Sequence, residues 1–196
     1  MTFRLGLTGS IGMGKSTTAK LFSEAGCDVW DADAAVHRLY AKGGAAVGPM
    51  GAAFPEAIEA GAVSRDALKR IIGADPQALK RIEQIVHPLV GLDRESFVKG
   101  ATSDIIVFDI PLLFETGGEA RVDAVAVVSI DAETQRARVL ERGTMTEAQF
   151  EAIRAKQVPD AEKRARADYV ILTDTVEHAR AQVQDVVNDI RSKRLA

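Results

Sequence analysis

Apolar residues along the chain fall into two patterns: short continuous runs, and longer stretches in which they recur every three or four residues. The continuous runs lie at residues 3–7, 27–30, 105–108, 122–130 and 169–172. Such runs predict buried strands, and the near-continuous run at 122–130 favours a parallel strand covered on both faces. Because helical patterns separate the runs, we predict an α/β fold with a parallel five-stranded sheet, right-handed crossovers and flanking helices.

Helix boundaries are indicated by residues that cap or break helices. We predict a helix from residue 15 to about residue 25, ended by Gly26. A second helix covers 133–142, and the stretch 146–149 (Thr-Glu-Ala-Gln) has the pattern of a capping box that opens a third. The last helix is predicted to begin with Asp174 as its N-cap. Its apolar face carries Val176, Ala179, Val183, Val187 and Ile190.

Two segments do not fit a simple strand–helix alternation. Residues 34 to about 100 show helical patterns and no convincing strand, and they are too long for a crossover. Within them Asp75 and Pro76 predict a helix start, and His87-Pro88 is interpreted as the end of that helix. The charged stretch 142–166 predicts a mobile flap.

Composition narrows the class of protein. The chain has 196 residues, 46% of them apolar and 27% charged, with a formal net charge of −3. These values are typical of a soluble globular domain, and no basic run indicates a nucleic-acid partner. Cys27 is the only cysteine, which excludes an internal disulfide and fits a reducing compartment. We expect no signal peptide and no membrane span, and hence a cytoplasmic protein.

The stretch from Gly9 to Ser16 matches the phosphate-binding pattern G-x-x-x-x-G-K-[S/T] in full. Glycines let successive backbone N–H groups point at phosphate oxygens, and the following helix adds its positive end. Lys15 can reach the β and γ phosphates, and the Ser16 hydroxyl can ligate Mg²⁺. An apolar strand precedes the loop and a helix follows, so nucleoside triphosphate binding is strongly indicated.

Carboxylates follow two of the predicted strands. Asp109 ends the run at 105–108 and is placed like the aspartate that holds Mg²⁺ or its water shell; the alternative is a strand-end residue that meets solvent. Asp31 and Asp33 follow the second strand, at the sheet edge where ligands gather. Either could accept a proton from a substrate hydroxyl, or one could simply cap a helix.

Cations cluster after the fourth strand. Arg138 and Arg142 lie four residues apart, so they share a helix face and can clamp a phosphoryl group, although a solvated face is the alternative. Arg136 should point elsewhere. Of the cations further along the flap, some could reach ATP and most are expected to face solvent; they are Arg154, Lys156, Lys163, Arg164 and Arg166. A lone His87 beside a proline is more often a structural hydrogen-bonding residue than a catalyst.

Three classes of protein share such a loop: a small-molecule kinase, a GTPase or ATPase switch, and a nucleotide-binding assembly subunit. A GTPase should show Asn-Lys-x-Asp and a D-x-x-G after its third strand, but Ile-Pro-Leu-Leu follows Asp109. The long insertion and the arginine-bearing flap favour a kinase that holds a second substrate and excludes water. The residues alone leave a nucleoside monophosphate, gluconate and shikimate open as acceptors.

The order of these motifs resembles dephospho-coenzyme A kinases over almost the whole chain. The resemblance is carried by the segments 6–16, 31–33, 87–88, 109–115, 153–157 and 167–171, together with Arg138. It departs at Ser64, where the family often has Asp, and at Thr173, where it often has Asn. We expect Ser64 to cap the next helix, and we do not count Thr173 as a ligand.

The resemblance implies a P-loop nucleoside triphosphate hydrolase-like core (1–33, 102–140 and 167–196), a helical acceptor domain (34–101) and a lid (141–166). It implies transfer of the ATP γ-phosphate to the ribose 3′-hydroxyl of dephospho-CoA, with Mg²⁺, by a monomer or weak homo-oligomer. It implies that Asp33 accepts the proton of the substrate hydroxyl and that His87 lines the site that binds dephospho-CoA. The site residues so implied are Lys15, Asp33 and Arg138 for catalysis; Gly9, Gly12, Met13, Gly14, Lys15, Ser16, Thr17 and Arg142 for ATP; Asp33, His87, Asp109, Pro111, Leu112, Leu113 and Glu115 for the acceptor; and Ser16 and Asp109 (through water) for the metal.

Overall fold

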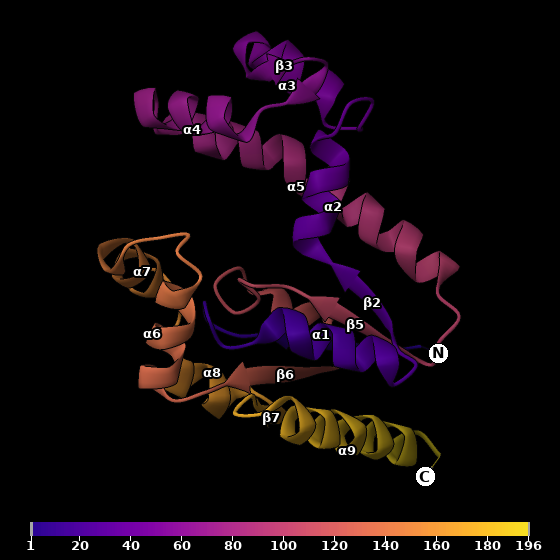
Figure 1. The fold of residues 1–196 in the computed structure, drawn as a ribbon. Helices are drawn as coiled ribbons and strands as arrows, with labels where there is room; N and C mark the ends of the chain where they lie inside the picture. The colour runs from indigo at the N-terminus through magenta and orange to yellow at the C-terminus, as the bar shows by residue number, and fades with distance from the viewer. Residues whose placement is uncertain (1, 196) are drawn as a thin grey trace. The chain divides into compact units, whose positions relative to one another are not determined.

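The structure is a computed structural model that describes residues 2–195 (Figure 1). The chain divides into two compact units. One runs up to Trp30 and resumes from Ala101 onward, and the other is Asp31–Gly100. The first unit includes residues 141–166, for which a lid is predicted, and Asp33 belongs to the second.

Five strands form the sheet of the first unit in the spatial order β2-β5-β1-β6-β7. β1 pairs in parallel with β5 and β6, and β6 pairs in parallel with β7. The predicted parallel sheet flanked by helices is confirmed, and each strand lies within two residues of its predicted bounds. The strands are β1 (Phe3–Thr8), β2 (Asp28–Asp31), β5 (Ile105–Asp109), β6 (Ala124–Ser129) and β7 (Tyr169–Leu172).

Two helix N-caps are predicted from the sequence in this unit, and one of them is confirmed. In the predicted capping box, Thr146 Oγ1 accepts from Gln149 N–H and Gln149 Oε1 accepts from Thr146 N–H. The prediction of Asp174 as the last N-cap is wrong, because Thr175 Oγ1 accepts the N–H of His178 at 3.1 Å. The helices are α1 (Lys15–Glu24), α6 (Ala132–Glu141), α7 (Glu147–Arg154), α8 (Asp160–Arg166) and α9 (Val176–Leu195), with the short 3₁₀ helix η2 (Gly118–Arg121).

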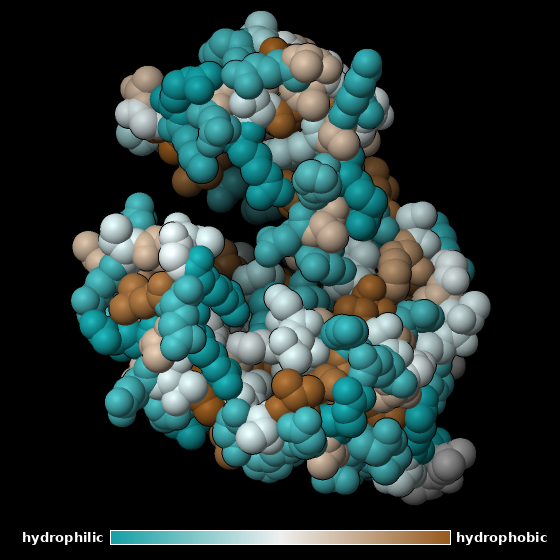
Figure 2. Space-filling model, viewed as in Figure 1, coloured by the Kyte–Doolittle hydropathy of each residue, from teal (hydrophilic) through white to brown (hydrophobic). Residues whose placement is uncertain are grey.

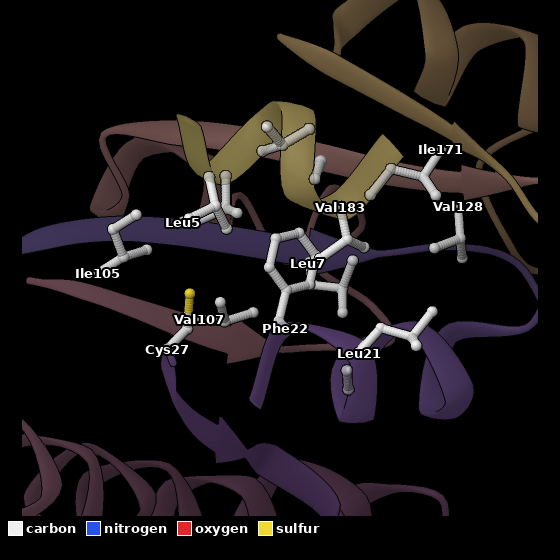
Figure 3. Close-up of a cluster of buried hydrophobic side chains, with 14 of the residues drawn as sticks. Leu5, Leu7, Leu21, Phe22, Cys27, Ile105, Val107, Val128, Ile171 and Val183 are labelled. Carbon is white, nitrogen blue, oxygen red and sulfur yellow. The ribbon is translucent and has the colours of Figure 1, made fainter. Parts of the chain in front are cut away.

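One face of the sheet packs against α1 and α9. Leu5 and Leu7 from β1 meet Phe22 from α1 and Val183 from α9, and each of these side chains is at most 1% exposed (Figure 3). Alternate residues of a strand face opposite sides of a sheet, which places both leucines on this face. This apolar layer holds β1 and α1, and therefore the loop between them, in a fixed arrangement.

The other face of the sheet is covered by the segment that follows β5. Leu113 and Phe114 pack with Val125 and Val127 of β6 in a separate buried cluster. Gly6 of β1 leaves room for this layer, since an added Cβ would lie 2.9 Å from Leu113 Cδ2. The sequence Pro-Leu-Leu-Phe-Glu is thus partly a core segment.

The second unit is mainly helical. Met50, Phe54, Leu68, Ile82 and Val86 lie in its buried cluster. Ser64 caps α4 as expected, since its Oγ accepts the N–H of Ala67 at 3.2 Å. Its elements are α2 (Ala32–Tyr40), α3 (Val47–Ala53), the 3₁₀ helix η1 (Pro55–Ala57), β3 (Ile58–Glu59), β4 (Ala62–Val63), α4 (Arg65–Ala74) and α5 (Gln77–Gly100).

Two predictions for this unit are wrong. β3 and β4 form an antiparallel hairpin where no strand is predicted, and its turn residues Ala60 and Gly61 have φ of 51° and 79°. Strands of two residues carry too little pattern to be recognised. His87 and Pro88 do not end a helix but lie inside α5. The apolar face continues past the proline, because Val86 before it and Val90 after it pack in the same cluster, which outweighs the hydrogen bond lost at Pro88.

The surface is largely polar. On the face drawn in Figure 2, hydrophilic residues cover most of the area and hydrophobic ones lie in separate spots. Within residues 2–195, every helix is too short or too polar to cross a membrane.

Candidate active site

The loop between β1 and α1 is held in a conformation that requires glycine. Gly14 lies directly before α1 with φ of 89°, in the left-handed region that side chains other than glycine rarely adopt. A Cβ on Gly14 would lie 3.0 Å from Thr173 Oγ1, and one on Gly9 would lie 2.3 Å from Val128 Cγ2. The loop therefore packs closely on β6 and on the residue after β7, and it leads straight into the N-terminus of α1.

Lys15, the first residue of α1, forms an ion pair with Asp109. Asp109 is the last residue of β5, paired in register with Leu7 of β1. Its side chain is 4% exposed and that of Lys15 is 16% exposed, so each charge offsets the cost of burying the other. The next residues, Ser16 and Thr17, are exposed. The structure thus brings together the predicted lysine and the predicted strand-end carboxylate.

Side chains from distant parts of the unit brace this loop. Ile11 N–H donates to Gln157 Oε1 at 3.1 Å, and Gln135 Nε2 donates to the Ile11 carbonyl at 2.7 Å. Thr173 Oγ1 donates to the Met13 carbonyl at 2.7 Å. The Met13 side chain is 3% exposed and belongs to the core, and the Met13 N–H donates to the Ser10 carbonyl at 3.2 Å. Three loop peptide groups are thereby fixed by residues that the sequence analysis does not assign to the site.

Arg138 and Arg142 line one cavity, as their spacing predicts. The cavity has a volume of about 180 Å³ and also includes Gly14, Thr17, Thr173 and Asp174. Arg138 makes two hydrogen bonds to Thr173. Its Nη1 donates to the Thr173 hydroxyl at 3.1 Å, and its Nη2 donates to the Thr173 carbonyl. Arg136 pairs instead with Glu147, at 2.6 Å. Two cations therefore lie beside the N-terminus of α1, where an anion is favoured.

A larger cavity borders the phosphate loop on another side. It has a volume of about 510 Å³ and is lined by Ser10 and Met13 of the loop and by residues of the stretch from α6 to α8, including Gln135, Arg154 and Gln157. Neither Lys15 nor Arg138 lines it. The phosphate loop therefore borders both cavities, and Arg138 and Arg142 line the smaller one.

The segment predicted to contact the acceptor is largely engaged with the protein itself. The Pro111 carbonyl accepts a hydrogen bond from Thr8 Oγ1 at 3.1 Å, and Leu113 is fully buried. Leu112 is 44% exposed. Glu115 Oε1 accepts the N–H of Val158 at 2.9 Å. In this arrangement Leu112 is the member of the segment whose side chain is available to a ligand.

Lys163 is buried, whereas the other cations of this stretch are exposed, as expected for most of them: Arg154, Lys156, Arg164 and Arg166. The Lys163 ammonium is 0% exposed and lies 2.9 Å from Glu115 Oε1, whose side chain is 13% exposed. Burial by itself would raise the pKa of Glu115, but the Lys163 ion pair and the Val158 N–H outweigh it and hold that pKa below its usual value. A buried lysine with a carboxylate partner cannot be distinguished in the sequence from its exposed neighbours.

The second unit carries Asp31, Asp33 and His87. Asp31 Oδ1 accepts the N–H of Ala34 at 2.9 Å and so caps α2, which confirms that one of the two aspartates is a cap. Asp33 is exposed in the first turn of the same helix, and His87 is exposed on α5. Asp33 is the aspartate of the pair whose carboxylate is not used as the cap.

Comparison with known proteins identifies the relatives of this chain. Residues 3–178 match the family model for dephospho-CoA kinase. The chain belongs to the dephospho-CoA kinase family. It is 72% identical over 192 residues to a dephospho-CoA kinase of Ruegeria pomeroyi, covering 98% of both chains. This family membership confirms the resemblance described above.

Solved structures share the fold of this chain. The chain resembles the crystal structure of the protein TT1252 from Thermus thermophilus with a TM-score of 0.86 and 31% identity, covering 96% of this chain and 97% of the other. It also resembles a dephospho-CoA kinase from Campylobacter jejuni with a TM-score of 0.70 and 22% identity, covering 99% and 100% of the two chains. The predicted P-loop kinase fold is thus confirmed.

Proposed function

We propose that this chain transfers the γ-phosphoryl group of ATP to the ribose 3′-hydroxyl of dephospho-CoA, producing CoA and ADP. The observation that supports this most is its match to the dephospho-CoA kinase family, with 72% identity to one named member across nearly the whole chain. The paired Lys15 and Asp109 beside a complete phosphate loop supply the chemistry that such a transfer needs.

On the ATP side, N–H groups of the loop from Gly9 to Gly14, other than that of Ile11, would hold the phosphates together with the N-terminus of α1. Lys15 is positioned at the start of α1 to neutralise charge on the β and γ phosphates. Arg138 and Arg142 line the cavity next to that helix and would bind the nucleotide and the phosphoryl group in transfer.

On the acceptor side, Asp33 would accept the proton of the ribose 3′-hydroxyl while the oxygen of that hydroxyl attacks the γ-phosphorus. The bond from the γ-phosphorus to the bridging oxygen of ADP then breaks, and ADP leaves with that electron pair. We assign the acceptor to the helical unit, with His87 and Leu112 as further contacts. Residues 141–166 would act as the lid that excludes water during transfer.

The residues present fit a magnesium ion. The Ser16 hydroxyl is exposed beside Lys15, and the Asp109 carboxylate ends β5, so both donors are oxygens. Within residues 2–195 no three His, Cys, Asp or Glu side chains gather as a metal cage. That suits Mg²⁺, which keeps waters and substrate phosphates as most of its ligands. When bound, it would neutralise charge on the β and γ phosphates.

We further propose that the protein acts in the cytoplasm as a monomer or weak homo-oligomer, without nucleic-acid or membrane partners.

The test is ADP release from purified protein with Mg²⁺-ATP and one acceptor at a time. The acceptors are dephospho-CoA, AMP, gluconate and shikimate. We expect dephospho-CoA alone to stimulate ADP release strongly. Equal rates with every acceptor and without any would refute the proposed transfer.

A further inference from the structure

Two consecutive residues connect the phosphate loop with the segment that follows β5. Gln157 Oε1 accepts the N–H of Ile11, inside the phosphate loop. The N–H of the next residue, Val158, donates to Glu115 Oε1 at 2.9 Å. The partners are far apart along the chain, so these contacts exist only through the fold. We call Gln157 and Val158 the 157–158 link.

The link is firmly anchored on the side of Glu115. The carboxylate that accepts from Val158 also pairs with the buried ammonium of Lys163, five residues further along the chain. Buried charges require partners, so removing either one leaves the other uncompensated. Glu115 is therefore committed to residues 158 and 163, and it fixes the stretch between α7 and α8 against the segment after β5.

On the ATP side the link acts on one peptide group. Ile11 N–H is used by Gln157, and the Ile11 carbonyl is used by Gln135 from α6. The two peptide groups on either side of Ile11 are therefore both oriented from outside the loop, one by Gln157 and the other by Gln135. Neighbouring N–H groups must point at phosphate oxygens, and hydrogen-bonded positioning to within a fraction of an ångström governs transfer rates.

We propose that the 157–158 link couples the phosphate loop to the acceptor segment, residues 111–115, with Gln157 and Glu115 as positioning residues that act through Ile11 and Val158. This rests on the proposed function for the identity of the acceptor. Disturbing the Glu115 end should weaken ATP binding, although Glu115 lies outside the phosphate loop. Disturbing Gln157 should in turn raise the KM for dephospho-CoA, because the same two hydrogen bonds connect Ile11 with the segment that contains Glu115.

The test separates the link from the ion pair. In Glu115→Gln with Lys163→Met, the ion pair is gone but an amide oxygen can still accept from Val158. In Glu115→Met with Lys163→Met, that acceptor is also lost. We expect the second pair to bind a fluorescent ATP analogue about fivefold more weakly than the first, a typical size for coupling between sites. Equal affinities in two folded proteins would overturn the proposal.

Gln157 is tested in the same proteins. Gln157→Met removes the side-chain oxygen that accepts the hydrogen bond from Ile11 N–H. Gln157→Glu keeps such an oxygen, so it should have a smaller effect than Gln157→Met. We expect Gln157→Met to raise the KM for dephospho-CoA. In the protein that already carries Glu115→Met, the same change should alter this KM little further. Effects that simply add, or that appear only in kcat with both KM values unchanged, would contradict the coupling.

A matched control lies in the same region. Glu151 pairs with Arg154 within α7 at 2.7 Å, and both side chains are about half exposed. Glu151→Gln should leave the analogue affinity and both KM values unchanged. Binding of the ATP analogue is measured without dephospho-CoA. These measurements can therefore refute the proposed coupling even if the protein transfers phosphate to dephospho-CoA. If no transfer to dephospho-CoA is observed, the proposed function itself fails.

Discussion

Replacing Thr173 with valine tests how the nucleotide cavity is held together. Thr173 is 7% exposed, and its hydroxyl donates to the Met13 carbonyl while accepting from Arg138 Nη1. Valine has nearly the same shape, so the change removes two hydrogen bonds without opening a cavity. The backbone carbonyl of residue 173 still accepts from Arg138 Nη2.

The expected loss follows from those two bonds. Each contributes on the order of 1 kcal/mol net, and a buried group left without a partner adds to the penalty, so we expect Thr173→Val to lose about 1–3 kcal/mol. Thr173→Ser keeps both bonds and loses one methyl group, which costs roughly 1 kcal/mol or less. With Arg138 less constrained and the loop released at Met13, we expect kcat/KM for ATP to fall about tenfold in the valine variant.

The assay combines urea unfolding with steady-state kinetics. Trp30, the single tryptophan, packs edge-on against Phe108 in the same unit at 5.9 Å and reports its unfolding by fluorescence. Thr173→Val should unfold at a lower urea concentration than Thr173→Ser and should show the lower kcat/KM for ATP. If the valine variant matched the serine variant in both measurements, the hydroxyl would have neither role and the reasoning would be refuted.

Other predictions concern catalysis, packing and thiol chemistry. Lys15→Ala should abolish transfer, whereas Asp33→Asn should cut turnover and leave ATP affinity nearly intact; equal loss of ATP binding in the second variant would exclude Asp33 as the proton acceptor. Phe22→Ala should lower the free energy of unfolding by about 3–5 kcal/mol, against less than about 1 kcal/mol for Val170→Ala at a 39% exposed position. Burial raises the pKa of the Cys27 thiol to about 11, so a thiol reagent at pH 8 should label native protein at least roughly 100-fold more slowly than urea-unfolded protein; comparable rates would show that Cys27 is accessible.

The sequence predicts features that depend on local patterns. Gly14 and Lys15 are recognisable because a phosphate loop needs those residue types at fixed spacing between a strand and a helix. The capping box from Thr146 to Gln149 is recognisable for the same reason, since its two hydrogen bonds join residues three apart. The strand runs are equally local, and they predict the sheet to within one or two residues.

What the sequence does not reveal depends on contacts between distant residues. Gln157 braces Ile11 across 146 positions, and Thr173 reaches Met13 across 160, so no spacing rule connects them. Lys163 looks like any cation of a charged stretch until Glu115 is placed beside it. The residues of the phosphate loop could be predicted from the sequence, whereas the residues that hold the loop in position could not.

The most direct test of the central claim is the identity of the phosphorylated product in a single turnover. Enzyme in excess over ATP is mixed with Mg²⁺ and dephospho-CoA, and the products are analysed by mass spectrometry and phosphorus NMR. The account predicts one ADP for each dephospho-CoA that gains a phosphoryl group, with that group on the ribose 3′-oxygen. Release of ADP with inorganic phosphate and unchanged dephospho-CoA, or phosphate on another hydroxyl, would contradict it.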